Sequence, residues 1–317
     1  MSIDYNPDNI FMFSFVRMNP PTPGHLSLIG TMINKAIELG SSKIYIITSS
    51  SLDGKNPLPC SSETIPKPKT KADGAIISSL SSGDSAYKSE ILTRMIASYR
   101  KSLIDSETDE AKKDKLARLN IIVLCSKGSP FGFIDSVINS DFVDRGIPKV
   151  NMFFIVGRDR ADFLDTIVDS FKVKPFIASI DGMVLEREGM EALKSSGMGT
   201  RSIAEINPSE YSASFVRKLV KNNQLYDFMQ VYGQYLSPEE TEKMYKTIQV
   251  GMQMKSPTSK EEDENPQSKY FDGKELPIVI AHTSGGRKRM ATKRRTLTKK
   301  RKTKRRKTKT KTKRRLY

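Results

Sequence analysis

Short apolar runs alternate along this chain with segments of helical spacing, and that alternation predicts a parallel β-sheet covered by helices. Five runs have the length and the β-branched or aromatic character of buried strands: residues 11–16, 43–48, 119–125, 150–156 and 175–180. The order strand, helix, strand therefore predicts the α/β class, with a Rossmann-like parallel sheet.

The segments between these runs repeat apolar positions every three or four residues, which is typical of amphipathic helices. Helices are expected at residues 26–39, 88–104, 131–143, from about 161, at 211–220 and within 224–254. Residues 105–115 are highly charged and are expected to form a link between elements. Residues 49–87, rich in Ser, Pro, Lys and Gly, are longer than an ordinary connection and are expected to form a lid or a disordered loop.

The turn between the first strand and the first helix carries the strongest chemical signal. Two prolines end the strand, Thr22 is a suitable N-cap, and Pro23 suits the first helical position. Gly24 lets a bulky anion approach the backbone, and His25 lies in the same turn. The N-terminus of a helix presents unpaired N–H groups and a partial positive charge, so this turn predicts a phosphate site.

The string TPGH at residues 22–25 resembles the (H/T)xGH signature of the nucleotidyltransferase superfamily. The wider string RMNPPTPGH resembles adenylyl- and cytidylyltransferase-like members, including those found in bacteriophages and large DNA viruses. The first position here is threonine rather than histidine, as in many adenylyltransferase relatives. Read without the resemblance, the same residues describe an ordinary strand–turn–helix connection with one surface histidine.

The resemblance assigns roles around this turn. It implies a sheet of the HUP/nucleotidyltransferase type, in which His25 stabilises the α-phosphate and Thr22 holds triphosphate oxygens. Phe15, Val16 and Arg17, at the end of the first strand, are expected to line the nucleotide site together with Gly24.

Three later segments are similar to the same family and follow in the family's order. The string SSSLDGKNPL after the second strand makes Lys55 a candidate phosphate ligand; the alternative is a solvated turn lysine. GRDR at residues 157–160 looks like the family's GxDR turn after the fourth strand. YSASFVR at residues 211–217 resembles its third motif, (I/Y)S(S/A)(T/S)xxR, at the start of a helix.

The chemistry of the GRDR turn suits a nucleotide. Gly157 allows close approach of a base or ribose, Asp159 can accept from ribose hydroxyls or hold a Mg²⁺-bound water, and Arg160 can contact phosphate. The ordinary alternative is an aspartate N-cap followed by a surface arginine.

The third motif can bind phosphate at a helix N-terminus. Ser212 and Ser214 can supply an N-cap and hydroxyl donors, and Arg217 shares a face with Ser214 three residues earlier. A guanidinium and a hydroxyl beside the helix dipole favour β- and γ-phosphate oxygens. The alternative is a plain N-cap with a solvent-facing arginine.

The resemblance spans about residues 11–235 and implies an enzyme. The expected reaction transfers a nucleotidyl group from an NTP, with ATP preferred, to a phosphorylated acceptor such as nicotinamide mononucleotide, and releases pyrophosphate. Mg²⁺ is expected on the nucleotide. The alternatives are a cytidylyltransferase acting on a small phosphorylated alcohol, and a catalytically weak nucleotide- or nucleic-acid-binding module.

The charge of the chain is concentrated at its end. Residues 287–317 contain 19 of the 53 lysines and arginines and no acid, which leaves 34 basic and 36 acidic residues elsewhere. We expect a nucleotidyltransferase domain at 1–254, a linker at 255–283 and a disordered tail at 284–317. The tail suits non-specific, salt-dependent contact with nucleic acid or nuclear targeting; the alternative is a solubilising tail.

Other features bear on the compartment. Cys60 and Cys125 are too few for a disulfide framework or a zinc cluster and are expected as thiols, which suits a reducing compartment. No long apolar run predicts a membrane span, and no secretory signal is recognised. The cytoplasm or the nucleus is therefore expected, in a viral setting if the resemblance extends to the source. An apolar island at residues 276–282 is a candidate edge strand, and His282 is given no role.

Overall fold

The computed structural model of the protein describes these residues: 6–68, 71–81, 83–158, 161–185, 211–254 and 280–282. The chain divides into two units, Met1–Thr283 and Ser284–Tyr317. The second unit, and with it the predicted basic tail, lies outside the described residues. Most of the predicted linker, residues 255–279, lies outside them as well.

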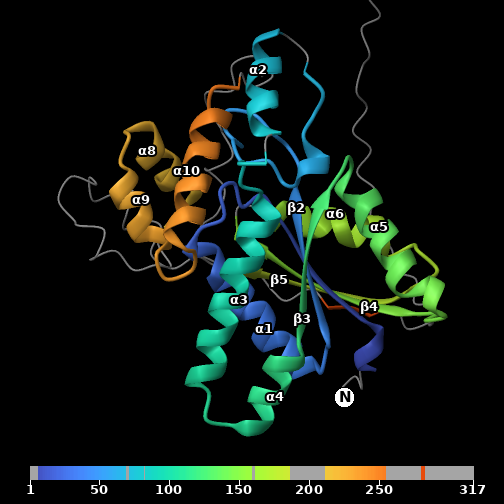
Figure 1. The fold of residues 1–317 in the computed structure, drawn as a ribbon. Coiled ribbons are helices and arrows are strands. Elements are labelled where there is room, and N and C mark those ends of the chain that lie inside the picture. Colours follow the sequence, from blue (N-terminus) through green and yellow to red (C-terminus); the bar gives the residue numbers. More distant parts are fainter. Residues whose placement is uncertain are drawn as a thin grey trace, which may run out of the picture. The chain divides into compact units, whose positions relative to one another are not determined.

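In the described residues, six strands form one sheet in the order β3-β2-β1-β4-β5-β6 (Figure 1). Their bounds are β1 Ile10–Val16, β2 Lys43–Ser49, β3 Asn120–Ser126, β4 Val150–Gly157, β5 Ile177–Leu185 and β6 Ile280–His282. Strands β1 to β5 are parallel, and β6 pairs antiparallel with β5 at the edge. The predicted α/β class and Rossmann-like parallel sheet are confirmed.

The path of the chain creates a switch point in this sheet. The chain moves outward from β1 through β2 to β3 and then returns to β4, which lies on the other side of β1. The crossovers before and after that return lie on opposite faces. Doubly wound sheets bind their ligands at the carboxyl ends of the strands beside such a point, here between β1 and β4.

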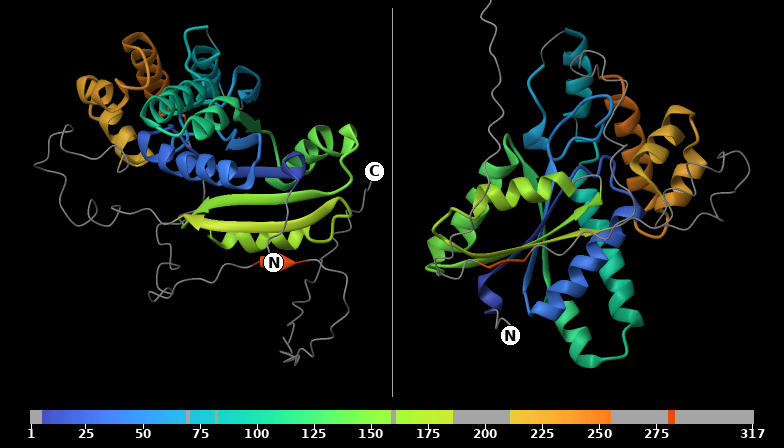
Figure 2. Two further views of the ribbon diagram at one scale, coloured as in Figure 1. Left: turned by 90° about the horizontal axis from the view of Figure 1, so that it is seen from below. Right: turned by 180° about the vertical axis from the view of Figure 1, so that it is seen from behind.

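Helices cover both faces of the sheet, as Figure 2 shows for α1 and α3 on one face and α6 on the other. The helices are α1 Pro23–Leu39, α2 Lys71–Leu80, α3 Lys88–Ser106, α4 Glu110–Arg118, α5 Pro130–Asp141, α6 Ala161–Phe171, α8 Ala213–Lys221, α9 Leu225–Tyr232 and α10 Pro238–Gly251. Three short 3₁₀ turns complete the described elements: η1 Pro7–Asn9, η2 Ser62–Thr64 and η3 Val143–Arg145.

Strand β1 is buried throughout and, apart from Ser14, apolar, because it lies between two cores. Ile10 and Met12 belong to the core under α1 and α3, whereas the alternating residues Phe11, Phe13 and Phe15 belong to the core under α5 and α6. The rings of Phe11 and Phe13 stack at 4.9 Å between centroids. A central parallel strand is expected to read as a continuous apolar run for this reason.

Local chemistry sets both ends of α1, as the sequence predicts. Thr22 is the N-cap, Pro23 occupies the first turn, and Gly40 ends the helix in the left-handed conformation with φ of 74°. The N–H of Gly40 bonds back to the carbonyls of Ala36 and Ile37. A residue with a side chain would be strained at that φ, which explains the glycine.

Two segments differ from the sequence prediction. The second half of the charged link expected at 105–115 is helical, because α4 runs from Glu110 to Arg118. It is capped by Asp109, whose side chain accepts from the N–H groups of Ala111 and Lys112. Only Leu116 of this helix is buried, so it has no apolar stripe from which a helix could be recognised. The long connection after β2 contains α2, and it also packs against the core through Leu58.

The expectation of two unlinked thiols is wrong, because Cys60 and Cys125 form a disulfide. The segment after β2 folds back over the neighbouring strand β3, which brings the two Cα atoms to 5.8 Å although they are 65 residues apart. The inference of a reducing compartment from the cysteines therefore loses its support.

None of the helices in the described part of the chain has both the length and the apolar character needed to span a membrane.

Gly251, at the end of α10, lies directly against the segment after β2. A Cβ at this position would lie 1.9 Å from the carbonyl oxygen of Pro57. We expect Gly251→Ala to lower the free energy of unfolding by about 2–3 kcal/mol, because backbone on one side must shift. Urea denaturation measures this. Gly132→Ala is the control, since no atom lies within 4 Å of that added Cβ; equal losses in both variants would contradict the prediction.

Candidate functional site

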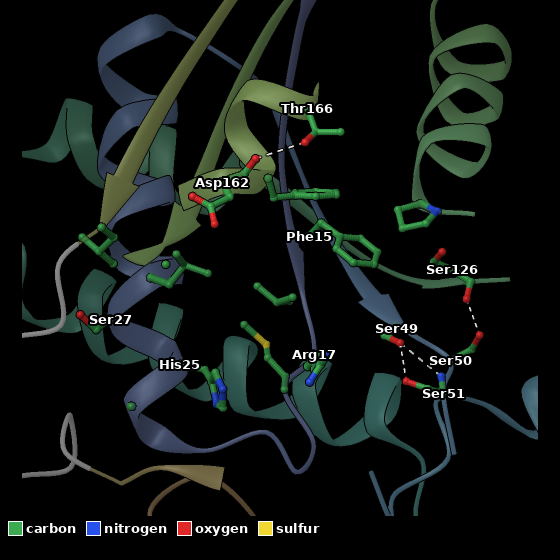
Figure 3. A pocket seen from close by; sticks show the side chains of 18 of the residues that line it. Phe15, Arg17, His25, Ser27, Ser49, Ser50, Ser51, Ser126, Asp162 and Thr166 are labelled. Atoms are coloured by element: carbon green, nitrogen blue, oxygen red, sulfur yellow. Dashed lines mark hydrogen bonds between the residues drawn. The ribbon is translucent and has the colours of Figure 1, made fainter. Parts of the chain in front are cut away.

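A cleft of about 780 Å³ opens at the carboxyl ends of the parallel strands (Figure 3). All five parallel strands contribute to its lining, through Phe15 and Val16, Ser49, Ser126, Gly157 and Leu185. It lies at the switch point of the sheet, where this class of fold binds ligands. Its volume is within the range of about 300–1,000 Å³ that is usual for small-molecule sites.

The polar groups of the cleft lie on separate sides of it. Figure 3 shows His25 and Ser27, both from α1, on one side and a group of serines on the opposite side, with Arg17 between them. Asp162 and Thr166 enter from α6. An anion bound at the N-terminus of α1 would therefore lie on one side of Arg17, and a polar ligand group bound at the serines would lie on the other side.

The residues expected from the sequence fall into three sets. The cleft is lined by six of them: Phe15, Val16, Arg17, Gly24, His25 and Gly157. A second set does not line it: Thr22, Lys55, Ser212, Ser214 and Arg217. Asp159 and Arg160 lie outside the described residues. The sequence reasoning missed the serines, Asp162, Phe163 and Thr166, because single polar residues near strand ends and helix starts carry no distinctive pattern.

His25 is held in place by the residue that caps its helix. The N–H of Thr22 donates to His25 Nδ1 at 3.0 Å, and the N–H of His25 donates to the carbonyl of Thr22 at 2.9 Å. The Thr22 hydroxyl lies 2.8 Å from the same ring nitrogen. Because Nδ1 acts as the acceptor, a neutral His25 ring carries its proton on Nε2. The side chain is buried but still lines the cleft.

Helix α8 docks on this same turn, although it lies nearly 200 residues further along the chain. The hydroxyl of Thr22 donates to the carbonyl of Tyr211 at 2.7 Å. Arg217 Nη1 donates to the carbonyl of Asn19 at 2.5 Å, and Nη2 donates to Ser214 Oγ at 3.1 Å. The predicted first and third motifs are therefore in direct contact, and Arg217 is bound to the backbone of the β1–α1 turn.

The N-terminus of α8 forms as the sequence predicts. Ser212 is the N-cap, and its hydroxyl accepts from the N–H of Phe215 at 3.1 Å. Burial lowers the pKa of Arg217, and the nearby charge of Asp53 opposes that change. Since an arginine begins far above neutral pH, the guanidinium remains charged.

Asn19 joins the segment after β2 to the β1–α1 turn. Its side-chain amide donates to the carbonyl of Leu58 at 3.0 Å, and its side-chain oxygen accepts from the N–H of Leu58 at 2.9 Å. The peptide bond between Asn19 and Pro20 is cis. The sequence reasoning missed this role. The asparagine inside the string NPP was the available signal, but its partner 39 residues away is not a local feature.

Lys55 lies in the same segment but is exposed. It occupies a turn in which Asp53 accepts from the N–H groups of Lys55 and Asn56, at 2.8 and 2.9 Å. The turn is near the site, since the charge of Asp53 acts on Arg217. The lysine side chain itself does not line the cleft.

The sequence has no match among protein-family models, and no curated protein is similar to it. In the described residues, no group of three or more His, Cys, Asp or Glu side chains is arranged to hold a metal ion.

The serine side and the aromatic floor complete the cleft. Ser49 Oγ and Ser51 Oγ lie 2.6 Å apart, and the hydroxyl of Ser50 donates to the carbonyl of Ser126. The ring of Phe163 packs against Phe15 and Phe131, with centroids 5.6 and 5.4 Å apart. The cleft thus combines a helix N-terminus, hydroxyl groups and flat apolar surface, which suits a ligand with phosphates and a ring.

Proposed function

We propose that the protein is a nucleotidyltransferase of the (H/T)xGH type with a HUP-type sheet. It would transfer a nucleotidyl group from an NTP, preferably ATP, to a phosphorylated acceptor such as nicotinamide mononucleotide, and release pyrophosphate. One observation supports this most strongly. The RMNPPTPGH turn and the YSASFVR helix start resemble two motifs of one active site, and they bond to each other: the Thr22 hydroxyl donates to the carbonyl of Tyr211, and Arg217 donates to the carbonyl of Asn19.

The proposed chemistry is a direct in-line displacement. An oxygen of the acceptor phosphate attacks the α-phosphorus, a new P–O bond forms, and the bond to the β-phosphate breaks with its electrons leaving on pyrophosphate. No group of the protein forms a covalent intermediate. The protein's part is positioning and the stabilisation of developing charge.

Residues at the N-terminus of α1 would share the positioning of the nucleotide and the stabilisation of charge. His25 would donate from Nε2 to an oxygen of the α-phosphate, beside the backbone N–H groups at Gly24. Thr22, fixed by its bond to the carbonyl of Tyr211, would hold the turn in its conformation. The nucleotide is expected to carry Mg²⁺ on its phosphates. Asp159 and Arg160, outside the described residues, would face ribose and phosphate.

Arg217 would bind the β- and γ-phosphates of the nucleotide. A guanidinium has five N–H donors, and its bonds to Asn19 and Ser214 use two of them. Neither Arg217 nor Ser214 lines the cleft itself, so the triphosphate would run from the cleft past the first turn of α1 towards α8. Lys55 could add a charge from the exposed turn after β2.

A pyrophosphate-release screen tests the reaction. The full chain is incubated with Mg²⁺ and either ATP or CTP, against nicotinamide mononucleotide, phosphocholine, glycerol 3-phosphate and a sugar phosphate. Turnover with ATP and nicotinamide mononucleotide would support the proposal in full. Turnover with CTP and a phosphorylated alcohol would support a nucleotidyltransferase but reject ATP and nicotinamide mononucleotide as its substrates.

The basic tail gives the competing outcome. We propose that residues 284–317, which carry the excess positive charge, bind nucleic acid without sequence preference. No turnover with any substrate pair, together with salt-sensitive DNA binding lost on deleting residues 284–317, would favour a binding module over an enzyme. Activity in the cytoplasm or the nucleus of a host cell fits either outcome.

A further inference from the structure

Lys88, the first residue of α3, is buried beneath the serine side of the cleft. Its relative exposure is 1%, and in the described part of the chain no other lysine or arginine is fully buried. Nζ donates to the carbonyl of Ser49 at 2.5 Å, and the backbone N–H of Lys88 donates to the carbonyl of Pro59 at 2.8 Å. The ammonium group is therefore fixed directly under a residue that lines the cleft.

Among the described residues, Lys88 has no carboxylate partner, and the side-chain bond of its amine is to the Ser49 carbonyl. Burial lowers the pKa of Lys88 to about 7. A charged group removed from water without a counter-charge destabilises a folded protein. Such a residue has a physical use where a negatively charged ligand binds next to it.

The surface above Lys88 is suited to an oxyanion. Ser49, Ser50, Ser51 and Ser126 line this side of the cleft (Figure 3). The Ser50 hydroxyl donates to the carbonyl of Ser126, and one hydroxyl of the Ser49–Ser51 pair donates to the other. The remaining hydroxyl of that pair and the Ser126 hydroxyl can donate to phosphate oxygens. The one acidic residue that lines the cleft in the described chain, Asp162, enters from α6, on a different side in Figure 3.

We propose that the serine side of the cleft binds a phosphate monoester and that Lys88 supplies its counter-charge from below. That this phosphate belongs to the acceptor substrate rests on the proposed function, in which the phosphates of the nucleotide bind at the N-terminus of α1. The reaction needs a second phosphate group, and Arg17, between the two sides, would stand close to both. Lys88 is then a positioning residue that acts through the Ser49 backbone and through its charge.

Calorimetric titration with inorganic phosphate tests the site without requiring turnover. We expect Lys88→Gln, which keeps a donor for the Ser49 carbonyl but removes the charge, to weaken phosphate binding at least tenfold. Lys115→Met, at an exposed position of α4, is the matched control and should bind phosphate as the wild type does. His25→Ala should retain the Lys88-dependent binding, since it lies on the opposite side of the cleft.

A second variant covers the case in which Lys88→Gln does not fold. Ser51 is exposed, so Ser51→Ala is expected to fold and to weaken phosphate binding about threefold or more. Wild-type affinity in both Lys88→Gln and Ser51→Ala, or no phosphate binding by the wild type, would overturn the inference. Lys88-dependent phosphate binding in a protein that shows no pyrophosphate release would leave the anion site standing and reject only the proposed reaction.

Discussion

Replacing His25 by alanine is expected to reduce kcat/KM for pyrophosphate release by about 10²–10³-fold. The imidazole Nε2–H would be lost from the α-phosphate, where charge develops in the transition state, and loss of one such donor has effects of this size. The acceptor of the Thr22 N–H is lost at the same time, so unfolding free energy should fall by about 1 kcal/mol. Initial rates with the best substrate pair, and urea denaturation, measure the two effects separately.

His282→Ala is the control for this prediction. His282 is the other histidine of the chain and lies on the edge strand β6, where it pairs with Ser179 near the amino end of β5. Its replacement should leave kcat/KM within about twofold of the wild type. An enzyme that keeps full activity without His25 would exclude the proposed role of the imidazole, whatever the change in stability.

Replacing Arg217 by alanine is expected to lower kcat/KM about 10²-fold or more, with a marked rise in KM for the nucleotide. The variant removes charged donors to the β,γ-phosphates. It also leaves the carbonyl of Asn19 without the bond that holds α8 to the β1–α1 turn. We therefore expect a loss of about 1–3 kcal/mol in unfolding free energy as well.

Two further substitutions separate these effects. Lys218→Ala changes the next, exposed residue of α8 and should alter neither KM nor stability appreciably. Arg217→Lys keeps the charge but loses the planar fork, so it should recover only part of the activity. If Arg217→Ala lowers stability while KM and kcat stay unchanged, the residue is a structural clamp and the proposed triphosphate contact is wrong.

The β1–α1 turn was predictable because its chemistry is local. Thr22 as N-cap, Pro23 in the first turn and His25 three residues beyond the cap are neighbours in sequence, and their mutual bonds close within that span. Gly40 at the other end of the helix is predictable for the same reason. The lining by Phe15 and Arg17 followed once the strand and the turn were placed.

The errors have a common physical origin. The α4 helix has one buried residue, Leu116, and so lacks the apolar stripe on which helix prediction depends. The disulfide joins Cys60 to Cys125 across two different segments, and spacing along the chain does not encode that meeting. Lys88 has the sequence context of an ordinary first-turn lysine, yet it is buried because the segment after β2 packs over it.

The parallel α/β sheet and the N-terminal turn of the first helix follow from the amino-acid sequence alone, since periodicity and capping act within a few residues. Which of the distant segments meet at the cleft depends on tertiary packing. It brought Arg217 onto the backbone of Asn19, left Lys55 at the surface, and placed Lys88 under the serines. Those contacts result from packing between elements far apart in the chain, where the burial of apolar surface sets the geometry and the polar residues follow.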